Sequence, residues 1–376
     1  MTDDNLAREQ EGEKVRKVLI LTDGGDAPGL NAVLRAFVTT ATKFDLLVYG
    51  SEDGFAGLVE EPGRIVRLTP SIVCGILPKG GSILGCSDQA DPFAYKVTDP
   101  GGSEKTRDVS ERIKAKLDEL EIDILVLVGD GRTLGTGMRF AKMGVAVVGI
   151  PKAIGNELAA TDVTFGLDSA VTTATAALDA LHSTDEAHDR VMVLEVMGRE
   201  AGWIALMSGI AGGADVILIP EIPYDVDRVV EKIAAHSSST HRFSVIVVGE
   251  GSKALGATVS RINEAHESAS QRHEGPGFQL ARLLEGRIDH EIQVTVLGHL
   301  QRDSSPSSFD RILGTRFGVY AAELCYHDNT GQVVALRGQE VLSVPLEAAV
   351  ANLRRVPPDG ELVRVARAMG IELGQE

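Results

Sequence analysis

Short runs of branched apolar residues recur along the chain, and each is soon followed by Gly or Pro and then by a stretch with helical spacing. Strands of a parallel sheet read as continuous apolar runs, because helices bury both faces of the sheet. The runs lie at residues 17–22, 124–128, 145–150, 190–196, 215–219, 243–248 and 293–297. We therefore expect an α/β fold with mostly parallel sheets and with helices at 31–44, 105–120, 133–143, 168–183, 200–210, 226–236 and 308–324.

Length and composition allow two lobes. The 376 residues, of which 43% are apolar and 41 are glycines, are enough for a compact protein of two lobes, each with its own core. The pattern places a loose boundary near Pro151 and a second crossing of the chain between lobes near Ser305. The predicted divisions are a polar tail at 1–16, lobes at 17–150 and 151–304, and a segment at 305–376 that packs across both lobes.

Net charge excludes two classes of partner. With 37 Lys and Arg against 54 Asp and Glu, the net charge is −17, so we expect no nucleic acid and no membrane surface as partner. Any anionic ligand must be held by a local cluster of cations. Three widely spaced cysteines and no apolar run of about 18 residues predict a cytoplasmic protein.

Two glycine-rich turns follow apolar runs and open helices. Residues 22–31 (TDGGDAPGLN) come after the first run, and residues 128–135 (VGDGRTLG) come after the second. Glycines at the carboxyl end of a strand let the backbone approach a phosphate, whose charge then meets free N–H groups and the helix dipole. Asp130, at the strand tip, is placed like a metal-binding carboxylate. Neither turn fits the Walker or the GxGxxG spacing, so the alternative is that they are tight turns only.

These turns and five further stretches together resemble the phosphofructokinase family, from about Lys17 to Gly318. The matching stretches are residues 24–31, 50–58 (GSEDGFAGL), 80–85 (GGSILG), 195–202 (EVMGREAG), 211–220 (AGGADVILIP) and 297–316 (LGHLQRDSSPSSFDRILGTR). The resemblance implies a two-lobed subunit with the nucleotide on lobe 17–150, the sugar phosphate on lobe 151–304, and phosphoryl transfer across the cleft. It also implies a homo-oligomer, a dimer or a tetramer, whose sites are completed by a neighbouring subunit.

The resemblance also assigns residues to ligands. ATP is the implied co-substrate with Mg²⁺, because pyrophosphate users carry a second aspartate where this chain has Gly131. A lysine at the position of Lys152 is found in pyrophosphate users, and some ATP users carry it too. Asp130 is the implied metal ligand. The implied nucleotide residues are Gly24, Gly25, Gly131, Thr133 and Gly135, and the implied residues for a phosphorylated or anionic acceptor are Lys152, Arg190, Met197, Gly198, Arg199, Glu250, Gln293, His299 and Arg302.

The loop at 151–157 (PKAIGNE) departs from the family pattern. The family's catalytic loop reads Pro-Lys/Gly-Thr-Ile-Asp-Asn-Asp, and its first aspartate is the base that takes the proton of the attacking hydroxyl. Here that position is Gly155, the threonine is Ala153, and the second aspartate is Glu157. A positioned base contributes roughly 10²–10⁴ in rate.

Other functional positions also change. The arginine that bridges two phosphates is Asp88, and the serine after Gly131 is Arg132, so a cation is lost from one loop and gained on the opposite one. Gln293 stands where the family has an arginine, and loss of one arginine from a phosphate clamp removes roughly 1.5–3 kcal/mol. We take Asp88, Arg132 and Glu157 as candidate catalytic residues, and we expect Asp88 and Arg132 to act as a coupled pair.

Three functions fit these departures. The first is a phosphotransferase whose site has been repurposed for another phosphosugar or anionic acceptor, since an acceptor that is already anionic needs no base. The second is a non-catalytic homologue that binds nucleotide or sugar phosphate and regulates or assembles with an active kinase. The third is a genuine 6-phosphofructokinase in which Glu157 or Asp88 has become the base.

Overall fold

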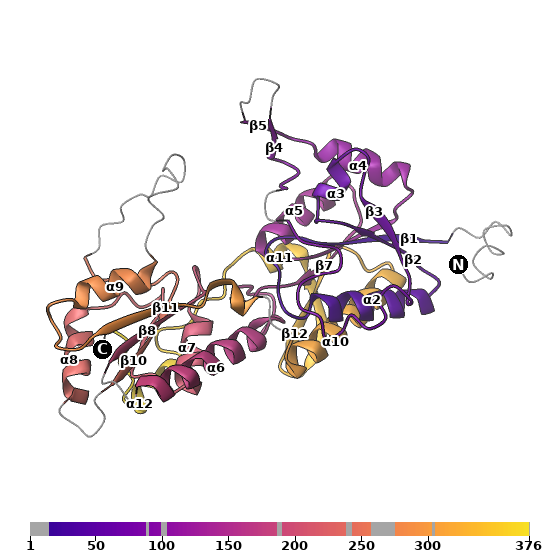
Figure 1. The fold of residues 1–376 in the computed structure, drawn as a ribbon. Helices are drawn as coiled ribbons and strands as arrows, with labels where there is room; N and C mark the ends of the chain where they lie inside the picture. The colour runs from indigo at the N-terminus through magenta and orange to yellow at the C-terminus, as the bar shows by residue number, and fades with distance from the viewer. Residues whose placement is uncertain are drawn as a thin grey trace. The chain divides into compact units, whose positions relative to one another are not determined.

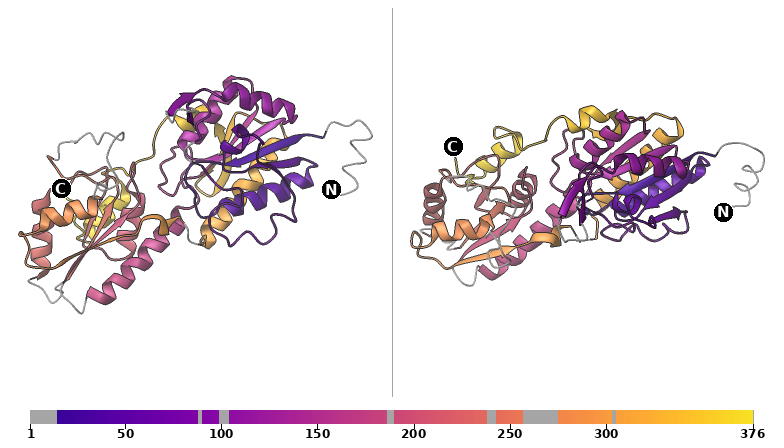
Figure 2. Two further views of the ribbon diagram at one scale, coloured as in Figure 1. Left: turned by 45° about the horizontal axis from the view of Figure 1, so that its top comes forward. Right: turned by 90° about the horizontal axis from the view of Figure 1, so that it is seen from above.

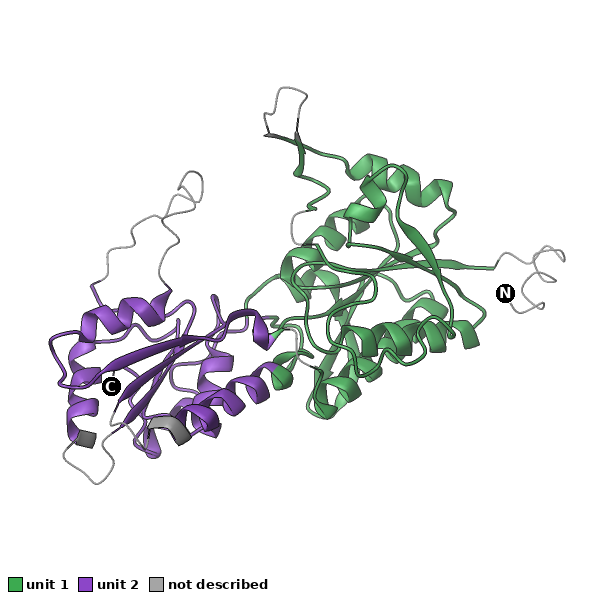
Figure 3. Ribbon diagram, in the orientation of Figure 1, with its two compact units in different colours: residues 1–154, 158–169, 302–353 green, residues 155–157, 170–301, 354–376 purple. Residues whose placement is uncertain are grey.

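The computed structural model describes residues 15–87, 90–98, 104–185, 190–237, 243–256, 275–302 and 305–375. The chain divides into two compact units (Figure 3). Unit 1 consists of Met1–Ile154, Leu158–Ser169 and Arg302–Leu353, and unit 2 of Gly155–Glu157, Ala170–Gln301 and Arg354–Glu376. The C-terminal segment expected at 305–376 is thus shared, with 305–353 in unit 1 and 354–376 in unit 2. The ligand-binding roles given to the lobes stay predictions.

Unit 1 is built on a seven-stranded sheet in the order β13-β12-β7-β6-β1-β2-β3. The five strands from β12 to β2 run parallel, and β3 and β13 are antiparallel edge strands. The bounds are β1 Lys17–Thr22, β2 Leu47–Ser51, β3 Ile65–Leu68, β6 Ile124–Gly129, β7 Val147–Pro151, β12 Gln332–Arg337 and β13 Glu340–Pro345.

Helices cover both faces of this sheet (Figures 1 and 2). On one face α2 packs along α10, and Gly318 lets them approach because a Cβ there would lie 2.5 Å from Val33 O. The other face is covered by α3, α4, α5 and α11, whose apolar side chains form one buried cluster with those of β1 and β6. The bounds are α2 Leu30–Lys43, α3 Ala56–Val59, α4 Ser110–Glu119, α5 Gly131–Lys142, α10 Ser308–Tyr326 and α11 Leu346–Val350.

Unit 2 has a four-stranded, fully parallel sheet in the order β11-β8-β10-β9. Apolar residues of α8 and α9 form a buried cluster with one face, and α7 packs on β9 and β10. Helix α6 begins in unit 1 and continues into unit 2. The bounds are β8 Val191–Val196, β9 Val216–Leu218, β10 Ser244–Gly249, β11 Ile292–Val296, α6 Leu167–Asp185, α7 Trp203–Ala211, α8 Val226–Ser237, α9 Pro276–Leu284, the 3₁₀ turn η1 Gly298–Gln301, and α12 Glu361–Ala368.

The predicted α/β class with mostly parallel sheets is confirmed. One predicted helix boundary is wrong, because the helix expected at 105–120 begins only at Ser110. Residues Glu104–Arg107 instead form strand β5, which pairs antiparallel with β4, Tyr95–Thr98. Among the described residues, no helix combines the length and the apolar character that crossing a membrane requires.

Candidate active site

The backbone of the glycine loop that follows β1 lies close to Asp130. Gly24 has a positive φ of 75°, and a Cβ atom on it would lie 2.7 Å from Asp130 Oδ2. Gly29, with φ 105°, ends the loop at the N-terminus of α2. Asp23 N donates to Val128 O over 3.0 Å, which ties the loop to the end of β6. The loop therefore needs glycine at 24 for conformation and for space.

Asp130 caps helix α5 with one carboxylate oxygen. Its Oδ1 accepts hydrogen bonds from the N–H groups of Arg132 (3.0 Å) and Thr133 (3.1 Å), and Oδ2 lies beside Gly24. Gly135, in the first turns of this helix, has no heavy atom within 4 Å of an added Cβ. Oδ2 takes no part in the cap. A carboxylate oxygen beside a helix N-terminus is suited to hold a hard cation that accompanies an anion.

The donor set at Asp130 fits Mg²⁺ only if phosphate oxygens or water complete its coordination. Among the described residues there is no group of three or more His, Cys, Asp or Glu that could hold a metal. Mg²⁺ is commonly bound through one or two carboxylates plus substrate phosphates rather than by an all-protein cage. The single Oδ2 of Asp130 beside the glycine loop agrees with that arrangement.

Two cations lie against the backbone of the glycine loop. Lys152, only 2% exposed, donates from Nζ to Asp23 O (2.8 Å) and to Gly25 O. Arg302 donates from Nη1 to Asp26 O (2.8 Å), and the same nitrogen lies 2.8 Å from the position of a Cβ on Gly25. Burial lowers the pKa of Lys152, while Asp130 acts to raise it. The loop that is expected to bind phosphate therefore has two basic side chains next to it.

Asp23 belongs to this site and was not identified from the sequence. Its Oδ2 accepts a hydrogen bond from Thr133 Oγ1 (3.0 Å), which itself lies 3.3 Å from Asp130 Oδ1. Burial raises the pKa of Asp23 to about 6, against the lowering effect of Thr133 and Lys152. The signal was present, since an acidic residue directly after a buried strand and before a Gly-Gly pair is a placement typical of functional carboxylates.

Arg132 lines a cavity of about 420 Å³ at the start of α5. Its side chain is 72% exposed, and Nη2 lies 3.8 Å from Asp130 Oδ2. Asp88 lies outside the described residues, so the coupling expected between Asp88 and Arg132 stays a prediction. The lining residues are Asp23, Ala90, Asp91, Arg132, Thr133, Gly135, Thr136, Met138 and Arg139.

In unit 2, the carboxylate of Glu157 folds back over Gly155. A Cβ atom built on Gly155 would lie 2.6 Å from Glu157 Oε2. Asn156 between them has a φ of 53°, a left-handed conformation that asparagine adopts more readily than most residues. This turn brings the side chain of 157 onto the space above 155.

A second cavity, of about 410 Å³, lies in unit 2. It contains two expected acceptor residues, Arg199 and Glu250, which form an ion pair over 3.0 Å. Arg355 and Glu200 form a further pair over 3.6 Å. The lining residues are Arg199, Glu200, Pro220, Glu221, Glu250, Gly251, Ser252, Lys253, Pro276, Gln279 and Arg355.

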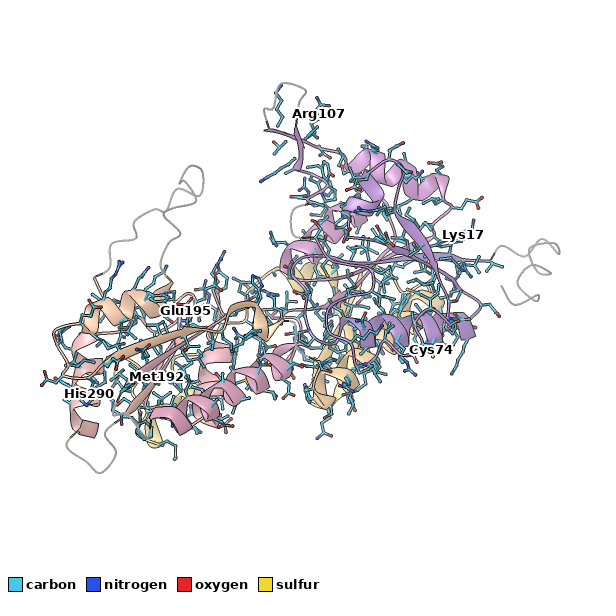
Figure 4. All side chains as sticks on the ribbon, viewed as in Figure 1. Lys17, Cys74, Arg107, Met192, Glu195 and His290 are labelled. Carbon is cyan, nitrogen blue, oxygen red and sulfur yellow. The ribbon has the colours of Figure 1, made fainter. Side chains whose placement is uncertain are left out.

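The lining residues Arg199, Pro220 and Glu250 follow the C-terminal ends of β8, β9 and β10. Glu195 in β8 (Figure 4) is 7% exposed, and its Oε2 accepts a hydrogen bond from Gly277 N over 2.9 Å at the start of α9. Burial raises the pKa of Glu195. Gly198 requires glycine, with φ 132° and Ala201 O at 2.7 Å from an added Cβ, and its carbonyl accepts from Gly251 N. Met197 N donates to Gln301 Oε1 over 3.2 Å.

Two further acceptor candidates, Arg190 and Gln293, lie at the N-terminal ends of β8 and β11, whereas His299 follows the C-terminal end of β11. Glu291 accepts from Arg190 Nε (2.8 Å) with one oxygen and from Gln293 Nε2 (2.5 Å) with the other. The three side chains together are close to neutral, because Gln293 adds no charge to the ion pair. His299 is exposed on η1.

A model of the family described as Phosphofructokinase matches residues 17–325. The chain belongs to the phosphofructokinase family. The resemblance drawn from the sequence is confirmed, and the protein is a phosphofructokinase-like phosphotransferase of the kinase type.

Individual members differ in their named donor. The ATP-dependent 6-phosphofructokinase 2 of Clostridium perfringens is 46% identical over 362 residues, which cover 96% of this chain and 98% of the relative. The pyrophosphate–fructose 6-phosphate 1-phosphotransferase of Streptomyces coelicolor is 44% identical over 346 residues, covering 91% and 96%. The structure of Pichia pastoris phosphofructokinase in the T-state matches with a TM-score of 0.76 and 27% identity. That match covers 95% of this chain, which spans about a third (36%) of the Pichia chain.

The candidate residues of this member of the family fall into two groups. Unit 1 brings together Gly24, Gly25, Asp130, Gly131, Thr133, Gly135, Lys152 and Arg302. Lys152 and Arg302 were expected with the acceptor and lie against the glycine loop, so their ligand stays a prediction. Unit 2 carries Gly155, Glu157, Arg190, Met197, Gly198, Arg199, Glu250, Gln293 and His299.

Proposed function

We propose that this phosphofructokinase-family protein transfers the γ-phosphoryl group of ATP·Mg²⁺ to a phosphorylated or otherwise anionic small molecule, with an acceptor preference that has shifted away from fructose 6-phosphate. The observation that supports ATP·Mg²⁺ binding is the short distance between Asp130 Oδ2 and Gly24. Lys152 and Arg302 also donate hydrogen bonds to the backbone of the glycine loop. The names of the relatives from Clostridium perfringens and Chloroflexus aurantiacus, both ATP-dependent 6-phosphofructokinases, agree with it.

Under this proposal, the residues in and around the glycine loop have different roles in binding the donor. Gly24, which carries no Cβ, lets the phosphates approach the backbone of the loop, and Lys152 and Arg302 offset their charge. Asp130 holds the cation, which supplies charge neutralisation on the transferring group when bound. Phosphoryl transfer depends chiefly on such positioning and electrostatic stabilisation.

The shifted acceptor preference is supported by the cluster at Glu291. With an arginine at 293, as in the family pattern, the cluster would carry a net positive charge toward a phosphate; with Gln293, Arg190 is offset by Glu291 alone. Each charge-assisted hydrogen bond to phosphate is worth roughly 1.5–3 kcal/mol. We infer that the acceptor's phosphate is held less tightly here or is absent.

The sites of the working enzyme are completed in a homo-oligomer, a dimer or a tetramer, under the same proposal. Arg190 is the residue expected to reach into the neighbouring subunit. A second candidate donor, pyrophosphate, is favoured by two observations: Lys152 donates to the backbone of the glycine loop, and a relative from Streptomyces coelicolor is named as pyrophosphate-dependent.

Binding and turnover test the proposal together. Calorimetry with ATP·Mg²⁺ and with pyrophosphate·Mg²⁺, on wild type and on Asp130→Ala, should give binding to one donor that the variant weakens at least tenfold. Turnover should then exceed background with that donor and at least one sugar phosphate or carboxylate acceptor. Tight ATP binding without turnover of any acceptor would favour the non-catalytic homologue, and equal affinity of both proteins would contradict the donor site.

A further inference from the structure

Glu157 occupies the space that a side chain on Gly155 would fill, in a loop where the family carries its base. We propose that Glu157 is the general base of this enzyme and that the acceptor atom is therefore a hydroxyl oxygen of a sugar or sugar phosphate. This inference rests on the proposed function and narrows it, since a carboxylate or phosphate acceptor would need no base.

The local backbone explains how one acid replaces another. Gly155 is buried and lies outside the residues with positive φ, so its own backbone conformation would accept a side chain. What excludes one is Glu157 Oε2, at 2.6 Å from the Cβ position. The left-handed turn at Asn156 directs the longer side chain of 157 back over 155. The Glu157 carboxylate thus lies where a side chain on residue 155 would begin.

A strap at residues 354–356 joins this loop to the acceptor cavity of unit 2. Arg354 N donates to Glu157 O over 2.8 Å, and the next residue, Arg355, lines the cavity. Val356 N donates to Glu221 Oε1 over 2.8 Å, and Glu221 lines the same cavity. The backbone of Glu157 is therefore anchored through three consecutive residues to the cavity that holds Arg199 and Glu250.

The strap also contacts the chain's single tryptophan, Trp203, at the start of α7. Trp203 Nε1 donates to Arg354 O over 3.1 Å, and the Arg354 guanidinium lies 4.4 Å from the centre of the indole ring. Ligand binding in the cavity should therefore change tryptophan fluorescence, which gives a binding signal independent of turnover.

The proposed step moves one proton and one phosphoryl group. The acceptor O–H proton passes to the Glu157 carboxylate as the acceptor oxygen forms its bond to the γ-phosphorus. The bond between the γ-phosphorus and the β,γ-bridging oxygen breaks, and its electron pair leaves with ADP. Glu157 then releases the proton to solvent, so that ATP and the alcohol give ADP, the phosphoester and H⁺.

The test compares four proteins with ATP·Mg²⁺ and fructose 6-phosphate as probe: wild type, Glu157→Gln, the double variant Glu157→Gln with Gly155→Asp, and Glu340→Gln as a matched surface control. Glu157→Gln keeps the shape of the side chain and removes only its basicity. We expect kcat to fall at least 100-fold while the Trp203 fluorescence titration with fructose 6-phosphate stays within about threefold of wild type. The acid limb of the kcat against pH profile should vanish in Glu157→Gln and return, with at least tenfold recovery of kcat, in the double variant. Glu340→Gln should behave as wild type.

Each outcome decides between the two proposals. A wild type that turns over and a Glu157→Gln protein within threefold of it at every pH overturns the base assignment alone. Failure of the double variant to recover, together with altered fluorescence titration in Glu157→Gln, assigns Glu157 a structural role and also overturns it. A wild type that binds ATP·Mg²⁺ and produces no ADP with fructose 6-phosphate, with other sugar phosphates or with carboxylates overturns the proposed function and this inference with it.

Discussion

Glu157 Oε2 lies 2.6 Å from the point where a Cβ atom on Gly155 would be. Real side chains do not approach that closely, so a side chain at 155 and the carboxylate of 157 are mutually exclusive in this conformation. The absence of the family's aspartate at 155 therefore does not by itself remove a carboxylate from the loop.

Gly155→Ala tests that exclusion without adding a charge. The new methyl group should push the Glu157 carboxylate aside, because it meets the end of a flexible side chain rather than backbone. We expect kcat to fall while the free energy of unfolding changes by less than about 1 kcal/mol. Thermal unfolding and steady-state kinetics check this. An alanine variant with unchanged kcat would contradict the exclusion.

Gly24→Ala should weaken donor binding, and Gly144→Ala is its matched control. Both glycines have positive φ, 75° and 87°, so each alanine should cost roughly 1–2 kcal/mol of backbone strain. Only at Gly24 does the added Cβ meet a functional group, Asp130 Oδ2 at 2.7 Å; at Gly144 nothing lies within 4 Å. Calorimetry should show at least tenfold weaker ATP·Mg²⁺ binding for Gly24→Ala alone. Similar affinities for both variants would argue against phosphate binding at this loop.

Gln293→Arg should strengthen binding of a phosphorylated acceptor. The substitution gives the cluster of Arg190, Glu291 and Gln293 a net positive charge, and one charge-assisted hydrogen bond is worth roughly 1.5–3 kcal/mol, or about 10- to 150-fold in affinity. The dissociation constant of fructose 6-phosphate measures the effect, with Gln339→Arg in unit 1 as a charge control. If Gln293→Arg and Gln339→Arg bind the sugar phosphate equally well, residue 293 does not contact the acceptor.

Asp310 should make stability depend on pH. This carboxylate is fully buried and accepts hydrogen bonds from Ser169 N (2.8 Å) and Oγ (2.6 Å), and burial raises its pKa to about 6 from 3.8. The folded state therefore holds the proton more tightly than the unfolded state, so stability falls as pH rises from 3.8 to about 6 and is level above it. Comparing wild type with Asp310→Asn from about pH 4.5 to about pH 7.5, we expect the difference in free energy of unfolding to change by roughly 2 kcal/mol, with wild type losing stability. Parallel curves for the two proteins would show that Asp310 is ionised throughout.

The sequence predicts the central strands because they are buried on both faces. Strands β1, β6, β7, β8 and β10 appear as continuous apolar runs. Strand β5 was missed, since Glu104–Arg107 has neither an apolar run nor alternation, and pairing with β4 alone determines its conformation.

At the candidate site, the sequence identified which residues take part better than it predicted where their side chains lie. Gly24 and Asp130 follow from the strand-turn-helix pattern. The position of the Glu157 carboxylate depends on the left-handed conformation of Asn156, and the anchoring of that loop depends on Arg354, almost 200 residues further along. Asp23 owes its raised pKa to burial by segments distant in sequence, which a pattern of residues does not contain.

The central claim, that this chain is an active phosphotransferase, is tested most directly by ³¹P NMR of purified wild type with ATP·Mg²⁺ and sugar phosphate acceptors, beginning with fructose 6-phosphate. We predict that the γ-phosphate signal of ATP declines as a new phosphoester signal of equal intensity appears, and that neither change occurs with Glu157→Gln. An ATP spectrum that stays unchanged with every acceptor, in a protein that calorimetry shows to be saturated with ATP·Mg²⁺, would contradict the claim.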